Sequence, residues 1–394
     1  MKFDKPLKTQ LDQIMRIQAD WPEMVKTHRD QAINSTIGVI LDPTSNKPMR
    51  PQIVDQIMTE SLSEINLTQD RGYQSQRGHG GYLKAHSNWV MDEYEEDWPQ
   101  AQSIGGTGAL TLAAEMMKQT SNTRKLLIDP GYGNHKNIFK DFDISIYKRQ
   151  VDNHPGYDHS VYVDALKSSS DNSWVLLQAV AYNGDGHDRT ARQWDQIYEI
   201  LSAKSMAVVI DCAYYGLADS FESDNYALKK LLKTDVPAMV CLSNSKNLGL
   251  YQERLGALYC LNVPKDQASD WQSQLNVIVR RLYSNASRLV AETASEVLSN
   301  DSYISQVERE IDQIRTGLLI ANRRAIVDVL GSEYSWINQT KGLFLQLFTG
   351  GFSELQLDQL RAKGVLILPN SRINVASISP ASIHRFADNL KSVI

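Results

Sequence analysis

Between residues 100 and 262, short apolar runs rich in Val, Ile and Leu alternate with longer segments of helical pattern. The runs cover residues 125–129, 144–147, 174–181, 207–211, 238–242 and 256–261. Several lack polar alternation, which is typical of strands covered by helices on both faces. The helical segments between the runs include residues 109–118, 191–202 and 226–233. This rhythm predicts an α/β domain in which a mostly parallel sheet is sandwiched by helices.

The rhythm stops after residue 283, where helical patterns at about 285–298 and 303–330 follow one another. Two apolar runs, 343–348 and 365–368, then flank a further helical pattern at 353–363. Such a mixture predicts a smaller α+β domain. We expect a large domain at residues 45–290, and a small domain formed by residues 291–394 together with an N-terminal arm, residues 1–44.

Composition excludes several classes of protein. A chain of 394 residues is too long for one compact core, and its net charge of -5 provides no strong cationic field for nucleic acid or an anionic membrane. No stretch approaches the roughly 20 apolar residues that span a bilayer. The three cysteines show no CxxC spacing, so neither a disulfide framework nor a metal site is expected. The first residues do not resemble a secretory signal, and we expect a cytoplasmic enzyme.

The strongest local signal follows the apolar run 238–242. Lys246 lies just beyond it, at the edge where open α/β sheets bind their ligands. Partial burial and neighbouring cations favour the neutral amine that Schiff-base chemistry needs. Arg254 and Ser243 are suited to hold a phosphate close by. The alternative is an ordinary solvated lysine in a loop between two strands.

Three weaker signals accompany this lysine. Asp211 ends the apolar run 207–211, where a carboxylate is costly unless it is paired, and Tyr214 follows it. Gly106 and Thr107 lie in a glycine-rich turn before a helical pattern, an arrangement that favours an anion. Arg372 follows a short apolar run and can clamp a carboxylate in a bidentate manner. Taken singly, each has a structural alternative: a capping aspartate, a simple turn or an ion pair.

Together these four elements supply what is needed to hold pyridoxal 5′-phosphate and an amino acid. The sequence resembles the fold type I pyridoxal-phosphate aminotransferases of class I, and within them the aspartate and aromatic aminotransferase branch. Residues 243–258 are similar to that branch's pattern SxSKNxGLYxxRxGAL over its whole length. Weaker similarity runs from about residue 33 to the C-terminus.

The resemblance implies a role for each matching position. Lys246 would carry the cofactor and act as base and acid, Asp211 would keep the ring nitrogen protonated, and Tyr214 would bond the ring's 3′ oxygen. The other cofactor-binding positions that it implies are Gly106, Thr107, Tyr132, Asn183, Ser243, Arg254 and Tyr73, the last reaching the phosphate from a neighbouring subunit. Substrate binding would fall to Arg372 at the α-carboxylate, with Gly38, Asn183, Tyr132, Phe344 and Arg288 around it.

Several positions depart from the family pattern. The family's HNPTG turn reads Tyr182-Asn183-Gly184-Asp185-Gly186, so the asparagine is kept while the proline and the threonine are replaced. Tyr132 stands where the family stacks a tryptophan, and Gly105 replaces a serine. The family's YSNPPxxGAR segment, whose arginine binds a distal carboxylate across the dimer, is shorter here and lacks its prolines. Arg288 is either its counterpart or a plain surface arginine.

The resemblance therefore implies a homodimeric enzyme with shared active sites that transfers the amino group of an aspartate-type or aromatic L-amino acid to a 2-oxo acid such as 2-oxoglutarate, by a ping-pong mechanism. Two alternatives stay open at this point. One keeps the cofactor but catalyses β-elimination or decarboxylation. The other is a catalytically silent cofactor-binding protein, which the altered turn and the missing prolines motivate.

Overall fold

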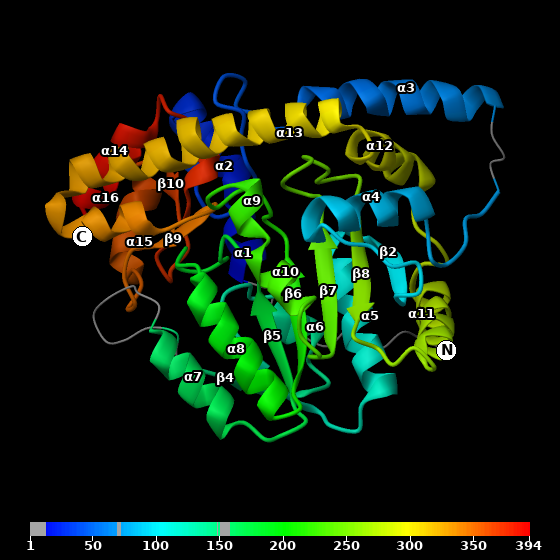
Figure 1. Cartoon of the computed structure of the whole chain (residues 1–394). Helices are drawn as coiled ribbons and strands as arrows, with labels where there is room; N and C mark the ends of the chain where they lie inside the picture. The colour runs from blue at the N-terminus through cyan, green and yellow to red at the C-terminus, as the bar shows by residue number, and fades with distance from the viewer. Residues whose placement is uncertain (1–12, 69–71, 148, 150–157) are drawn as a thin grey trace, which may run out of the picture.

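The computed structural model describes residues 13–68, 72–147, 149 and 158–394. At its centre is a seven-stranded sheet with the order β2-β8-β7-β6-β5-β3-β4 (Figure 1). Its strands are β2 (Gln100–Ile104), β3 (Lys125–Ile128), β4 (Asp143–Ile146), β5 (Trp174–Gln178), β6 (Ala207–Cys212), β7 (Ala238–Ser243) and β8 (Leu255–Leu261). Only β8 runs antiparallel to its neighbours, β7 and β2. The predicted α/β fold with a mostly parallel sheet is confirmed.

Helices cover both faces of this sheet, which explains the unbroken apolar runs. Along β7, Val240 belongs to one buried cluster while Met239 and Cys241 belong to the other, because successive side chains point to opposite faces. The first cluster takes in α4 (Gly80–Met91), α7 (His159–Ser168), α8 (Ala191–Ala203) and α10 (Tyr226–Leu231). The second takes in α5 (Gly105–Thr120), α6 (His135–Ile138) and α11 (Ala268–Leu282).

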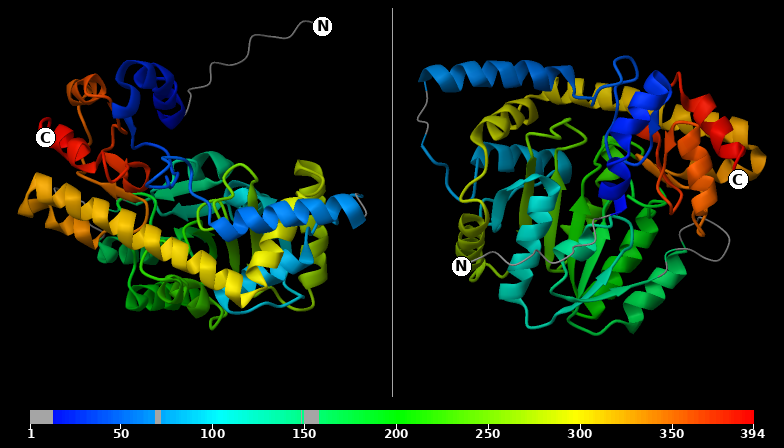
Figure 2. Two further views of the ribbon diagram at one scale, coloured as in Figure 1. Left: turned by 90° about the horizontal axis from the view of Figure 1, so that it is seen from above. Right: turned by 180° about the vertical axis from the view of Figure 1, so that it is seen from behind.

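The C-terminal part packs beside one end of the sheet. A long helical path crosses the top of the molecule in Figure 1 and continues into the C-terminal helices, as both views of Figure 2 show. It consists of α12 (Arg288–Leu298), α13 (Asp301–Ile314), the π-helical turn η2 (Arg315–Ile320) and α14 (Ala321–Leu330). The remaining elements here are η3 (Ser332–Gln339), α15 (Glu354–Ala362), η4 (Val375–Ser377) and α16 (Ile383–Lys391).

Two small sheets join distant parts of the chain. β1 (Ile33–Asn34) pairs in parallel with β10 (Val365–Leu366), and β9 (Phe344–Gln346) pairs antiparallel with β11 (Arg372–Asn374). The described N-terminal segment, which also holds α1 (Gln13–Gln18), α2 (Trp21–His28) and η1 (Arg29–Gln31), is thereby attached to the C-terminal part. α3 (Gln52–Thr68) then packs on α12 and α13, and the short α9 (Phe221–Asp224) follows β6.

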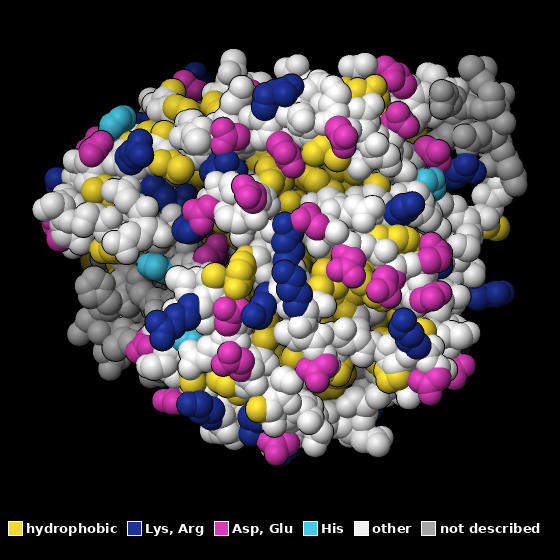
Figure 3. Space-filling model, viewed as in Figure 1, with side chains coloured by type: hydrophobic (Ala, Val, Ile, Leu, Met, Phe, Trp, Pro, Cys, Tyr) yellow, Lys and Arg dark blue, Asp and Glu magenta, His cyan; other side chains and the backbone are white. Residues whose placement is uncertain are grey.

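On the face that Figure 3 shows, neither positive nor negative side chains dominate the surface. Basic and acidic side chains are interspersed there, as expected of a chain with a net charge of -5. Within the described residues, every helix is too short or too polar to cross a bilayer.

Candidate active site

The residues that the sequence singles out gather at one edge of the sheet. β2, β3, β5, β6 and β7 all point the same way, so the loops after them meet at a common edge. β2 is followed at once by Gly105 and Gly106 of α5, and the loops after the other four strands carry Tyr132, Asn183, Tyr214 and Lys246, respectively. Five segments far apart in sequence are thus brought to one place by parallel strand order alone.

Lys246 lies in the turn after β7, where its side chain is largely shielded from solvent. Its Nζ atom is 5.0 Å from the centre of the Tyr214 ring. Burial lowers the pKa of this amine to about 8, with Asp211 acting against the shift and Arg254 acting with it. About a tenth of the amine is therefore neutral at pH 7, and the neutral form is the one that attacks a carbonyl carbon.

Asp211 occupies the end of β6 and is buried. The Nε2 atom of His135 lies 2.8 Å from its Oδ2 atom. Tyr132, in the loop that leads to His135, packs its ring edge-on against the imidazole at 5.1 Å between ring centres. The imidazole fixes the orientation of the carboxylate and leaves Oδ1 available for a ring N–H, a pairing that can hold a charge at a buried position.

A chain of hydrogen bonds connects three further predicted residues. Asn183 Nδ2 donates to the Tyr214 hydroxyl at 2.9 Å, and Arg372 Nη1 donates to Asn183 Oδ1 at 2.6 Å. The Arg372 guanidinium also lies over the Phe344 ring, 4.4 Å from its centre. Asn183 thus links the arginine predicted to bind a carboxylate with the hydroxyl predicted to bind the cofactor.

The glycine-rich turn and Arg254 form a cradle for an anion. Gly105 has φ +65°, and a Cβ there would lie 2.5 Å from Arg254 Nη2, so any side chain would displace the guanidinium. Ser243 stands against Gly106, and Arg254 Nη1 donates to Ser245 Oγ at 3.1 Å. α5 begins at this turn, so its unpaired N–H groups face the same place. Within the described residues Arg254 forms no ion pair, and a phosphate fits this set of donors.

The segment around Gly38 covers the site from the side of the small sheets. Asn374 Nδ2 donates to the carbonyl oxygens of Ile37 and Val39, the latter at 2.8 Å. A Cβ on Gly38 would approach the Phe344 ring to 3.3 Å and the Tyr214 hydroxyl to 4.0 Å. Gly38 therefore lies directly over two predicted site residues, and little room is left for a side chain at this position.

Two other predicted residues, Tyr73 and Arg288, have surroundings of a different kind. The Tyr73 side chain is 94% exposed. Arg288, at the first position of α12, pairs with Glu292 one helical turn later, with 3.2 Å between Nε and Oε2. His79 Nε2 lies 3.3 Å from the same carboxylate atom.

Three residues of the site were not predicted from the sequence. His135 was part of a segment matched to the family, but its contact with Asp211 joins positions 76 residues apart. Ser245 and Asn374 are small polar residues with no local signal of a role. The histidine could have been found by asking which side chain satisfies a carboxylate at a buried strand end.

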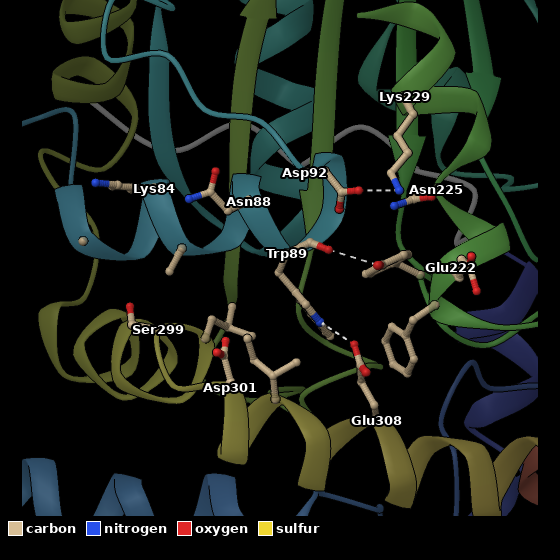
Figure 4. A pocket seen from close by; sticks show the side chains of 16 residues that line it. Lys84, Asn88, Trp89, Asp92, Glu222, Asn225, Lys229, Ser299, Asp301 and Glu308 are labelled. Carbon is tan, nitrogen blue, oxygen red and sulfur yellow. Dashed lines mark hydrogen bonds and ion pairs between the residues drawn. The ribbon is translucent and has the colours of Figure 1, made fainter.

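A separate hollow lies between α4, α9 and α13 (Figure 4). It has a volume of about 790 Å³, and none of the predicted site residues lines it. In this hollow Lys229 pairs with Asp92, and the Trp89 indole N–H donates to Glu308 Oε1 at 3.2 Å. This hollow is distinct from the candidate active site.

The sequence matches the family described as aminotransferase class I and II over residues 40–390. The mitochondrial aspartate aminotransferase of Schizosaccharomyces pombe is 31% identical over 313 residues, which cover 77% of this chain and 71% of that protein. The aromatic-amino-acid aminotransferase of Escherichia coli is 31% identical over 302 residues, 74% of this chain and 75% of that protein.

Solved aminotransferase structures have the same fold as this chain. An aromatic amino acid aminotransferase from Burkholderia cenocepacia superposes with a TM-score of 0.88 at 26% identity, covering 98% of this chain and 97% of that one. An aromatic-amino-acid aminotransferase from Burkholderia pseudomallei, covalently bound to pyridoxal phosphate, gives a TM-score of 0.89 at 24% identity, with 100% of both chains covered.

Proposed function

Because the chain belongs to the aminotransferase class I and II family, we propose that it moves the amino group of an aspartate-type or aromatic L-amino acid to a 2-oxo acid such as 2-oxoglutarate. Pyridoxal 5′-phosphate is the cofactor in this proposal. The observation that carries it is the convergence of Lys246 and Asp211 with the hydrogen-bonded chain from Tyr214 to Arg372. β-Elimination, decarboxylation and a silent binding role are not favoured, because the relatives named above are aminotransferases.

The residues present suit this cofactor group by group. The phosphate would lie in the cradle of Gly106, Thr107, Ser243 and Arg254. Asp211 would pair with the ring nitrogen, Tyr214 and Asn183 would bond the 3′ oxygen, and Tyr132 would stack on the ring. When bound, pyridoxal phosphate supplies an electron sink for the electron pair that remains on Cα when its proton leaves.

Lys246 would be the group that moves the proton. Its Nζ atom, neutral above a pKa of about 8 and increasingly protonated below it, would take the proton from the substrate Cα and deliver it to the C4′ carbon of the cofactor. Arg372 would bind the α-carboxylate and so hold the Cα–H bond in the reacting orientation. Its contact with the Phe344 ring restricts the guanidinium before the substrate arrives.

Substrate choice in this proposal depends on two positions. Tyr132 presents a smaller face than tryptophan and adds a hydroxyl, which changes the wall of the substrate pocket. Arg288 would bind a distal carboxylate, after exchanging Glu292 for the substrate. Such a site would accept dicarboxylic donors through the ion pair and aromatic donors without it.

A donor panel tests the function and the role of Arg288 together. Aspartate, glutamate, tyrosine and phenylalanine would be offered with 2-oxoglutarate to the wild type and to Arg288→Ala. Arg280→Ala, at an exposed position of α11, is the matched control. We expect the Arg288 variant to lose roughly tenfold or more in kcat/KM for the dicarboxylic donors alone. Absence of amino transfer with every donor would refute the function, and equal losses for all donors would refute the distal clamp.

The same proposal includes a homodimer with shared active sites, in which the exposed Tyr73 contributes to the phosphate site of the other subunit. It also includes closure of residues 291–394 and 1–44, as one domain, over residues 45–290. A cytoplasmic location completes it, and fractionation of the source cells would test that part.

A further inference from the structure

The turn that holds Asn183 lacks a proline, yet Asn183 contacts both Tyr214 and Arg372. A turn with glycine at positions 184 and 186 has more conformational freedom than one with a fixed proline φ. Something else must therefore hold this asparagine in place. The structure offers a buried cluster of charges directly behind the turn.

Arg149 is the centre of that cluster and contacts the turn through two of its nitrogens. Its Nε atom donates to Asp185 Oδ2 at 2.9 Å, and its Nη2 atom donates to the carbonyl oxygen of His187. Arg149 and Asp185 are 5% and 2% exposed, so water does not compete for these bonds. Burial alone would raise the pKa of Asp185, but Arg149 and His187 keep it at about 2, so the carboxylate stays charged.

Tyr182 explains why a glycine follows Asn183. The Arg149 guanidinium carbon lies 3.4 Å from the centre of the Tyr182 ring. On the glycine side, a Cβ at position 184 would come within 2.4 Å of Cε1 of the same ring. The ring thus fills the space that a larger residue at position 184 would need. Tyr182, Gly184, Asp185 and Arg149 form one mutually dependent set.

The third guanidinium nitrogen of Arg149, Nη1, contacts the start of another loop of the site. Its Nη1 atom lies 3.2 and 3.3 Å from the two carboxylate oxygens of Asp129, which is 1% exposed. Asp129 directly precedes the loop that carries Tyr132 and His135. This loop and the turn are in close contact, since a Cβ on Gly131 would lie 2.3 Å from the Asn183 carbonyl oxygen.

We propose that Arg149 is a positioning residue, which bridges Asp129 and Asp185 and so holds Asn183 and the Tyr132 loop in their working geometry. The ion-pair bridge takes the place of the proline that stiffens this turn in the family that the sequence resembles. The inference rests on the proposed roles of Asn183 and Tyr132. A buried ion pair is weak support for stability in itself, but a planar fork bound at both ends fixes direction as well as distance.

Hydrogen exchange of the cofactor-free protein tests the bridge without any enzymatic readout. In Arg149→Met, the amides of residues 183–187 should exchange roughly tenfold faster than in the wild type, while those of β5 stay unchanged. Asp185→Asn should produce the same local effect. In the double variant these amides should exchange no faster than in Arg149→Met, because both changes break the same bridge.

Arg189→Met is the matched control. The Arg189 side chain is also shielded from solvent and donates to Asp129 Oδ2 at 2.8 Å, but it lies against the rings of Tyr162 and Trp194. We expect this variant to lose stability without selective exchange at residues 183–187. If Arg149→Met leaves these amides protected, or if both variants accelerate exchange equally everywhere, the positioning role is wrong.

Kinetics supply the second readout. Because Asn183 bonds Arg372, Arg149→Met should raise KM for the amino donor by roughly tenfold, with a smaller loss of kcat. Arg149→Lys keeps the charge without the planar fork, and its KM should lie between those of the wild type and Arg149→Met. This variant also tests the bridge if the Met variant does not fold. If the wild type transfers no amino group, the proposed function fails while the exchange experiment still decides on the bridge.

Discussion

Lys246 has one anion and one cation as neighbours, and they act on its amine in opposite directions. Burial is the main cause that lowers its pKa to about 8 from the ordinary value of 10.5; Asp211 raises it and Arg254 lowers it further. Since the folded-state pKa is depressed, the neutral amine predominates only as the pH rises through about 8. Burial thus sets the reactivity of the amine, and two residues that lie 35 and 8 positions away in the sequence adjust it in opposite directions.

This environment predicts a pH dependence for cofactor uptake. The rate at which the cofactor-free protein forms its covalent bond to pyridoxal phosphate should rise about tenfold per pH unit below the pKa of Lys246 and level off above it. Arg254→Gln removes a cation and should move the plateau to higher pH. Stopped-flow absorbance measures both, with Arg361→Ala on α15 as a distant control. An inflection near 10.5 in the wild type would contradict the argument.

At the residue scale, the sequence allowed prediction of residues whose position follows from strand ends. Asp211 ends a buried run, Tyr214 and Lys246 lie within three residues of a strand end, and the parallel sheet does bring them together. It could not reveal the contact of His135 with Asp211, or the bridge made by Arg149, because both depend on how separate loops pack. Their residue types carry no local pattern that distinguishes them from surface residues.

At the element scale, the apolar runs 125–129, 144–147, 207–211, 238–242 and 256–261 correspond to strands β3, β4, β6, β7 and β8. β2 (Gln100–Ile104) was not predicted, because its sequence is polar. The buried Gln102 side chain accepts the His79 N–H and donates to the Ser287 carbonyl, and such partners exist only in the folded chain. The polar residues are satisfied by tertiary contacts, which override the strand pattern.

The helical pattern at 303–330 is also more than one element. It consists of α13, the π-helical turn η2 and α14. Arg315 begins the π turn and is buried, and its Nη1 atom donates to the Gly216 carbonyl oxygen at 2.7 Å. Gly216 lies two residues after Tyr214, and it has φ +86°. The hydrogen bond therefore joins the long helical path to the loop that follows β6.

Removing that bond should destabilise the protein. Arg315→Met leaves the Gly216 carbonyl without its donor, and we expect a loss of about 1–3 kcal/mol in the free energy of unfolding. Thr316→Ala is the control, since this exposed hydroxyl bonds the Asp312 carbonyl of its own helix and its loss should cost less than about 0.5 kcal/mol. Urea unfolding of the cofactor-free proteins measures both. Equal stabilities for the two variants would show that the hydrogen bond from Arg315 to Gly216 does not stabilise the protein.

At the scale of the whole molecule, the chain folds back on itself so that β1 joins β10 and Asn374 holds the Gly38 segment. The attachment of the N-terminal arm to the C-terminal part was expected from where the strand pattern begins. The partner strand and its register could not be predicted, since β1 and β10 have two residues each and no distinctive pattern. Only the tertiary arrangement of the small sheets determines them.

The subunit arrangement leads to a prediction that needs only two variants. Tyr73 is 94% exposed in the single chain, and in the proposed dimer it serves the site of the other subunit. Lys246→Ala should be inactive, and Tyr73→Ala should bind the cofactor roughly tenfold more weakly. A hybrid of the two has one site with an intact lysine and an intact tyrosine from different subunits.

Mixed and refolded Lys246→Ala and Tyr73→Ala chains should therefore regain activity at low cofactor concentration, towards the half-sites value of a hybrid dimer. Each variant refolded alone provides the baseline, and a tagged chain allows the hybrid to be isolated before the assay. If Tyr73 acted within its own subunit, the hybrid would contain no complete site, and mixing would give no more activity than the sum of the two baselines. The same absence of rescue would follow from a monomer, which sedimentation of the wild type distinguishes.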